Sequence, residues 1–141
     1  MITMLFPIVL IVFSNVFYNL STKLTPPKAN SFLSLTVTYI TAAVISFTAF
    51  LATSGAKSLA DEFAKLNRTS FILGLSIIGL ELGYIFLYRA GWKIGIGSLV
   101  ANISLACILL VIGIVFFKES FSLKQIIGMI VCVTGLILLT K

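Results

Sequence analysis

Glu81 is the one carboxyl-bearing residue inside the long apolar stretches of this 141-residue chain. An unpaired charge is expensive inside a lipid bilayer, so a lone carboxyl group there is a candidate for binding a cation or carrying a proton. The alternative is a structural glutamate, neutral or hydrogen-bonded to a tyrosine or asparagine, that joins two helices. At 100° per helical residue, Tyr84 and Tyr88 share the predicted face of Glu81.

Two further segments carry amide, phenol and hydroxyl side chains on one face. Asn15, Tyr18 and Asn19 fall within an arc of about 100° on a helix, and Ser98 and Asn102 share a face of a later helix. Such groups are costly against lipid and require a protein or water-lined surface. We therefore expect a polar cavity with a substrate-binding or ion-coupling role, lined by Glu81, Tyr84, Tyr88, Asn15, Tyr18, Asn19, Ser98 and Asn102.

The reactive residues needed for enzyme chemistry are missing from the sequence. The chain has no histidine, and its two cysteines, Cys107 and Cys132, lie in apolar segments without metal or redox spacing. One membrane carboxyl group without a nucleophile–base pair offers little for catalysis. We expect no enzyme activity, no metal and no cofactor.

The composition predicts an all-α integral membrane protein. Hydrophobic residues make up 60% of the chain and charged residues 10%, whereas charged residues are about 25% of typical globular proteins. Although the net charge is +6, the lysines and arginines lie between apolar runs. Anionic lipid headgroups are therefore the expected partner rather than nucleic acid. The expected location is the cell membrane, crossed several times.

The apolar runs predict one domain, residues 1–141, with five transmembrane helices. Each run approaches the length needed to cross a bilayer core of roughly 30 Å. Between the second and third runs, the polar segment 54–68 spaces apolar residues to suit a short helix at the headgroup level, with a solvated loop as the alternative. The predicted spans are about 3–22, 31–53, 71–88, 95–117 and 123–140.

The last two spans form a predicted helical hairpin. Their connection, residues 118–122, is so short that the second helix must return antiparallel to the first. Ser122 and Gln125 have the spacing of a capping box, which starts the last helix sharply. This last helix aligns the small residues Gly128, Cys132 and Gly135, a pattern that allows close approach of another helix.

The positive charges show no bias between the two sides of the membrane. Because cytoplasmic loops normally carry the excess of lysine and arginine, an even count predicts no preferred orientation. Such a chain inserts both ways, and two opposed copies can pair as an antiparallel dimer; the alternative is that one charged loop fixes a single orientation. One side carries Lys57, Lys65, Arg68, Lys118 and Lys124, and the other carries Lys23, Lys28, Arg89, Lys93 and Lys141.

The later part of the sequence resembles a known transporter repeat. A glycine-rich start, a span of small and polar residues, the turn FFKES-FS and the helix KQIIGMIVCVTGLILL are similar to the C-terminal part of an EamA-type repeat. The resemblance covers about residues 71–140 most clearly and places the chain in the drug/metabolite transporter superfamily. Typical members contain two such five-helix repeats in inverted orientation, so a single repeat implies dimerisation.

The segment Gly128–Leu139 also resembles the last helix of small multidrug resistance proteins, which pair through that helix. Carried over, the resemblance places Gly128, Cys132 and Gly135 at a dimer contact. The chain departs from that family at Phe13-Ser14-Asn15, where the family has its essential membrane glutamate.

These features lead to two functional hypotheses of different kinds. The first is a secondary transporter that moves a small organic solute or metabolite by alternating access as an antiparallel homodimer. The second is a non-transporting or lipid-carrier flippase subunit of a hetero-oligomeric membrane complex.

Overall fold

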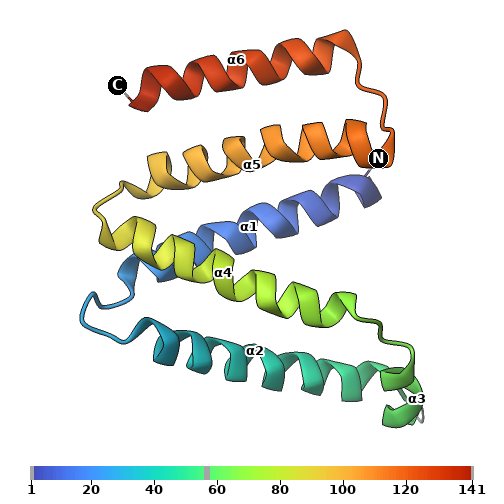
Figure 1. The fold of residues 1–141 in the computed structure, drawn as a ribbon. Coiled ribbons are helices and arrows are strands. Elements are labelled where there is room, and N and C mark those ends of the chain that lie inside the picture. The colour runs from blue at the N-terminus through green and yellow to red at the C-terminus, as the bar shows by residue number, and fades with distance from the viewer. Residues whose placement is uncertain (1, 56–57, 141) are drawn as a thin grey trace. The chain divides into compact units, whose positions relative to one another are not determined.

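The computed structural model describes the backbone of residues 2–55 and 58–140, and the side-chain surroundings of residues 5–55 and 58–139. All secondary structure in this part of the chain is helical, which confirms the all-α prediction (Figure 1). Lys57 and Lys141, which contribute to the charge count, lie outside the described residues. The helices are α1 (Ile2–Leu24), α2 (Ser31–Thr53), α3 (Leu59–Ala64), α4 (Thr69–Arg89), α5 (Ile94–Phe117) and α6 (Leu123–Thr140).

Four helices are long and apolar enough to cross a membrane. These segments are Leu5–Leu24, Ser31–Thr53, Thr69–Arg89 and Ile94–Phe117. Their large apolar side chains are mostly exposed within the chain, as expected of helices that face lipid. The apolar part of α6, Leu123–Leu139, is shorter, so the fifth span stays a prediction.

The helices divide into two compact units. The central unit is Leu24–Arg89, and the terminal unit combines both ends of the chain, Met1–Lys23 and Ala90–Lys141. The candidate site is described below for each unit separately.

In the central unit, α2 packs against α4. Leu35 on α2 and Ile85 and Tyr88 on α4 are the buried apolar side chains of this pair. Helix α2 begins sharply because the Asn30 side chain accepts a hydrogen bond from the Leu33 N–H at 3.1 Å. The threonine hydroxyl groups of α2, such as that of Thr41, donate to carbonyls of their own helix, which satisfies them in an apolar environment.

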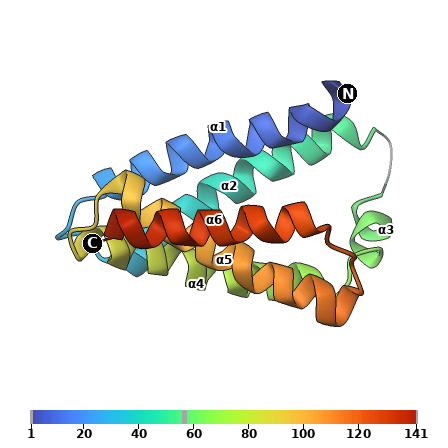
Figure 2. The ribbon, with the colours of Figure 1, turned by 90° about the horizontal axis from the view of Figure 1, so that it is seen from above.

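In the terminal unit, α6 returns alongside α5, as the sequence predicts (Figures 1 and 2). Helix α5 ends at a left-handed residue, Lys118, with φ 52° and ψ 33°. The N–H groups of Lys118 and Glu119 both point back to the Gly113 carbonyl, the latter at 3.0 Å. Helix α6 then begins with the predicted capping box, in which the Ser122 N–H donates to Gln125 Oε1 at 2.7 Å. The connection is therefore hydrogen-bonded at both ends.

Candidate functional site

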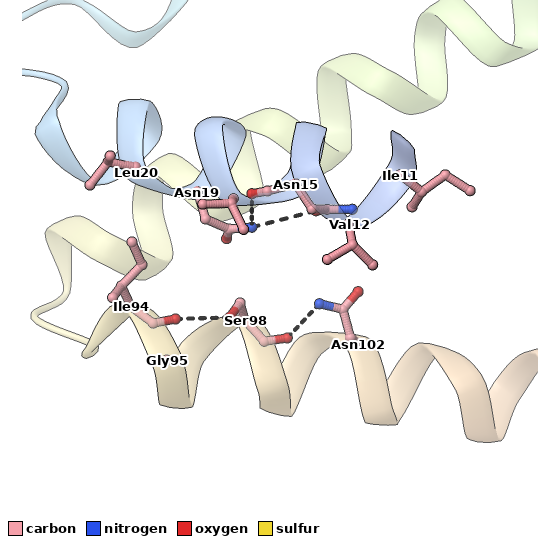
Figure 3. Close-up of a pocket in the computed structure, with 10 residues that line it drawn as sticks. Ile11, Val12, Asn15, Asn19, Leu20, Ile94, Gly95, Ser98 and Asn102 are labelled. Carbon is pink, nitrogen blue, oxygen red and sulfur yellow. Dashed lines mark hydrogen bonds between the residues drawn. The ribbon is translucent and has the colours of Figure 1, made fainter. Parts of the chain in front are cut away.

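A pocket of about 520 Å³ lies between α1 and α5 in the terminal unit (Figure 3). Its volume falls in the range of about 300–1,000 Å³ that is typical of small-molecule sites. Four of the eight residues predicted to bind a solute line it, namely Asn15, Asn19, Ser98 and Asn102. The rest of the wall is apolar or lacks a side chain, and consists of Ile11, Val12, Val16, Leu20, Ile94 and Gly95.

Helix α1 contributes a pair of asparagines one turn apart. The Asn19 Nδ2 donates to the Asn15 backbone carbonyl at 2.8 Å and approaches Asn15 Oδ1 at 3.4 Å. Asn19 is 8% exposed, whereas most described side chains of its helix are exposed. Because both nitrogen hydrogens are directed at its own helix, the orientation of the Asn19 amide is defined.

Helix α5 contributes a hydroxyl and an amide one turn apart. The Ser98 Oγ donates to the Ile94 carbonyl at 2.9 Å, and the Asn102 Nδ2 donates to the Ser98 carbonyl at 2.8 Å. Figure 3 shows the oxygen of the Asn102 amide directed across the pocket toward α1. Gly95 leaves room at the start of this wall because it has no side chain.

The pocket has polar groups but no charge. None of the ten residues that line it carries an ionisable side chain. It is therefore suited to hold a solute by hydrogen bonds and apolar contact. Across residues 5–55 and 58–139, no group of three or more histidine, cysteine, aspartate or glutamate side chains is placed to hold a metal ion.

Glu81 belongs to the central unit and is half-buried on α4. The spacing of Glu81, Ile85 and Tyr88 puts all three on one face of α4. The hydroxyl of Tyr39, on α2, is buried and makes no hydrogen bond of standard geometry within the described part of the chain. It nevertheless lies within electrostatic reach of the Glu81 carboxyl. Glu81 thus lies near Tyr39 across the α2–α4 pair.

The remaining predicted residues are aromatic. Tyr84 and Tyr88 lie on α4 with ring centroids 6.0 Å apart. Tyr18, on α1, is half-buried but does not line the pocket. The eight predicted residues are therefore divided between the two units, five in the terminal unit and three in the central one. Sequence reasoning missed Tyr39, which shares a face of α2 with the buried Leu35 and Ser31; the sequence does not reveal which face of this apolar helix is buried.

A model of the EamA-like transporter family matches residues 1–141, the whole chain. The chain belongs to the EamA-like transporter family. Comparisons with curated proteins and with solved structures give no match. This EamA-family chain is a membrane transporter of the drug/metabolite type, in agreement with its four apolar helices. The resemblance to an EamA-type repeat is thereby confirmed.

The predicted contact seam of this EamA-family chain is open. A Cβ atom added at Gly128 or at Gly135 would meet nothing within 4 Å among the described residues. Cys132, between them, is a free and exposed thiol. The surface of α6 that carries these three residues is thus available to another helix.

Proposed function

We propose that this EamA-family chain is a half-size secondary transporter that moves a small organic solute or metabolite across the membrane. The observation that carries the proposal is the α1–α5 pocket, which gathers two asparagines on α1 and a serine and an asparagine on α5. Polar side chains within transmembrane helices mark substrate and ion pathways because they are costly against lipid. The amides and the hydroxyl would orient the solute by hydrogen bonds.

We further propose that two copies work together in opposite orientation. One repeat would then supply each half of an inverted pair, and alternating access would follow from rocking one half against the other around a midplane cavity. The even distribution of lysine and arginine supports insertion in both directions. The open seam at Gly128, Cys132 and Gly135 offers a surface for the second copy.

In this proposal, Glu81 is the counter-ion or proton site. The nearby Tyr39 hydroxyl would help to orient the Glu81 carboxyl group. Replacement by glutamine keeps the shape of the side chain while removing its charge. Loss of solute flux into proteoliposomes with retained folding in Glu81→Gln would support this role, and unchanged flux and pH dependence would exclude it.

The orientation of the chain tests the central claim. A single cysteine placed after Lys141, with Cys107 and Cys132 replaced by serine, is exposed to a membrane-impermeant thiol reagent in intact cells. Because five spans put the two termini on opposite sides, labelling of about half the molecules is expected for dual insertion. Complete labelling or none would mean one fixed orientation and would point to an oppositely oriented partner chain.

A further inference from the structure

We infer that the α1–α5 pocket binds its solute through hydrogen bonds that the solute donates, so that the substrate is an apolar body with a hydroxyl or amino head group. The inference rests on the proposed function, since it takes this pocket to be the substrate site. It adds the chemical class of the solute and the atoms that select it.

The first step concerns the orientation of the Asn102 amide. A backbone carbonyl only accepts hydrogen bonds, so the atom 2.8 Å from the Ser98 carbonyl must be the amide nitrogen. The amide oxygen is therefore left on the pocket side, where Figure 3 shows it directed toward α1. This oxygen is an acceptor held in place by its own nitrogen.

The second step concerns the Ser98 hydroxyl. Its single hydrogen is donated to the Ile94 carbonyl at 2.9 Å. The hydroxyl oxygen can then only accept further hydrogen bonds. Ser98 and Asn102 lie four residues apart, so both acceptors occur on the same face of α5. The α5 wall of the pocket thus presents two oriented acceptors, the Asn102 amide oxygen and the Ser98 hydroxyl oxygen, beside the second hydrogen of the Asn102 amide nitrogen.

The α1 wall adds a hydrogen-bond donor. Asn19 directs both amide hydrogens at Asn15, whose Oδ1 is the acceptor of the weaker contact. The Asn15 amide nitrogen is a donor. A hydroxyl group can therefore donate to the α5 acceptors and accept from the Asn15 amide, whereas an ammonium group can only donate.

The third step concerns charge and shape. Because none of the ten lining residues is ionisable, a carboxylate would find no cation and would meet oxygen lone pairs on α5. A quaternary ammonium would find no carboxylate and has no N–H to donate. Ile11, Val16 and Leu20 on α1 provide apolar surface for the body of the solute. Both head-group charge and donor capacity should therefore affect binding.

Four probes that share a phenylethyl-type skeleton separate these effects: 2-phenylethanol, 2-phenylethylamine, its trimethylated quaternary form, and phenylacetate. Binding to the purified full-length protein in detergent is measured by calorimetry, with empty micelles measured alongside. We expect the alcohol and the primary amine to bind roughly two- to tenfold more tightly than the other two, since one lost hydrogen bond is worth about that factor. Equal or tighter binding of phenylacetate or of the quaternary ion would overturn the inference.

Two variants assign the effect to the pocket. Asn102→Leu removes the acceptor at similar size and should abolish the preference for the alcohol over the quaternary ion. Thr134→Val is the matched control, because the Thr134 hydroxyl donates to the Ile130 carbonyl of α6 at 2.8 Å and does not line the pocket. An unchanged preference in Asn102→Leu also overturns the inference.

The outcomes distinguish this inference from the proposed function. If phenylacetate binds best and loses affinity in Asn102→Leu, the pocket is a binding site but the donor class is wrong. If no probe binds, the inference fails, while the orientation experiment still decides the transporter proposal independently.

Discussion

Arg89 donates a hydrogen bond from its guanidinium to the Ser31 hydroxyl at 2.8 Å, which ties the end of α4 to the start of α2. The same guanidinium donates to the Ala29 carbonyl at 2.7 Å and to the Pro26 carbonyl at 3.3 Å. The planar fork of arginine suits this simultaneous binding of several acceptors. These three hydrogen bonds hold the connection before α2 against the end of α4 within the central unit, and they bury Ser31.

Arg89→Ala should lower the free energy of unfolding by about 1–2 kcal/mol, because charge-assisted hydrogen bonds are lost and a buried hydroxyl loses its partner. Arg89→Lys should recover only part of this, since an ammonium cannot reproduce the fork. Unfolding in a denaturing detergent titration measures the change. Arg68→Ala, just before the other end of α4, is the matched control; equal losses at both positions would contradict the interpretation.

Tyr39 and Glu81 should be coupled energetically across the α2–α4 pair. In a double-mutant cycle of Tyr39→Phe and Glu81→Gln, we expect a coupling energy of about 0.5–1.5 kcal/mol, as found for polar groups in contact. The readout is the free energy of unfolding in detergent. Additive effects of the two substitutions would show that the groups do not interact, and would leave Glu81 without its identified neighbour.

Lys118 adopts a left-handed conformation that costs a residue with a side chain about 1–2 kcal/mol. Lys118→Gly should therefore stabilise the α5–α6 connection relative to Lys118→Ala by roughly 1 kcal/mol, because glycine adopts this conformation freely. Both variants remove the same charge, so the comparison isolates the backbone. Equal unfolding temperatures for the two variants would argue against the left-handed turn.

Gly113 lies beneath the Glu119 side chain. A Cβ atom added at Gly113 would lie 2.6 Å from Glu119 Oε2, so the carboxylate must move to accommodate it. Alanine normally stabilises a helix interior over glycine by about 1 kcal/mol. Gly113→Ala should thus give little gain alone and the full gain together with Glu119→Ala. Gly74→Ala, where the added atom meets nothing within 4 Å, is the control for thermal unfolding.

The α6 seam should cross-link in a pattern that reveals orientation. Cys132 is near the middle of α6, so it meets its own copy in an antiparallel pair centred there. Position 128 would then lie about 12 Å along the axis from its own copy, beyond the reach of a disulfide. Oxidation should link wild-type chains through Cys132.

In a background lacking Cys107 and Cys132, Gly128→Cys alone should not cross-link, whereas a mixture with Gly135→Cys should. Dimer bands on a non-reducing gel measure this. Self-linking of Gly128→Cys would indicate a parallel pair.

Much of the fold could be predicted because it depends on local sequence. Long apolar runs define the helices, Pro26 and Pro27 mark the first turn, and Ser122 with Gln125 marks the start of α6. The division into two units could not be predicted, because every long helix is apolar on most of its surface. The pairing of apolar faces depends on how well their side chains fit together. A hydropathy pattern carries no information about this fit.

The same limit applies to the site. Helical arithmetic puts Asn15 and Asn19 on one face and Ser98 and Asn102 on another, and the cost of polar groups against lipid predicts a shared cavity. Neither argument determines which helices lie opposite each other. Glu81 was expected beside a cavity together with Tyr84 and Tyr88. Its interaction with Tyr39 depends on the packing of α2 against α4, which only the tertiary structure reveals.

The terminal unit is built from both ends of the chain, and this has a consequence for biosynthesis. The central unit is complete once Arg89 has been inserted, whereas α1 must wait until α5 ends at Phe117, about 28 residues or a few seconds later at common translation rates. During that interval, the Asn15 and Asn19 amides of α1 have no α5 opposite them. Helix α1, although made before the central unit, therefore completes its packing after it, and until then its polar face depends on the insertion machinery or the lipid.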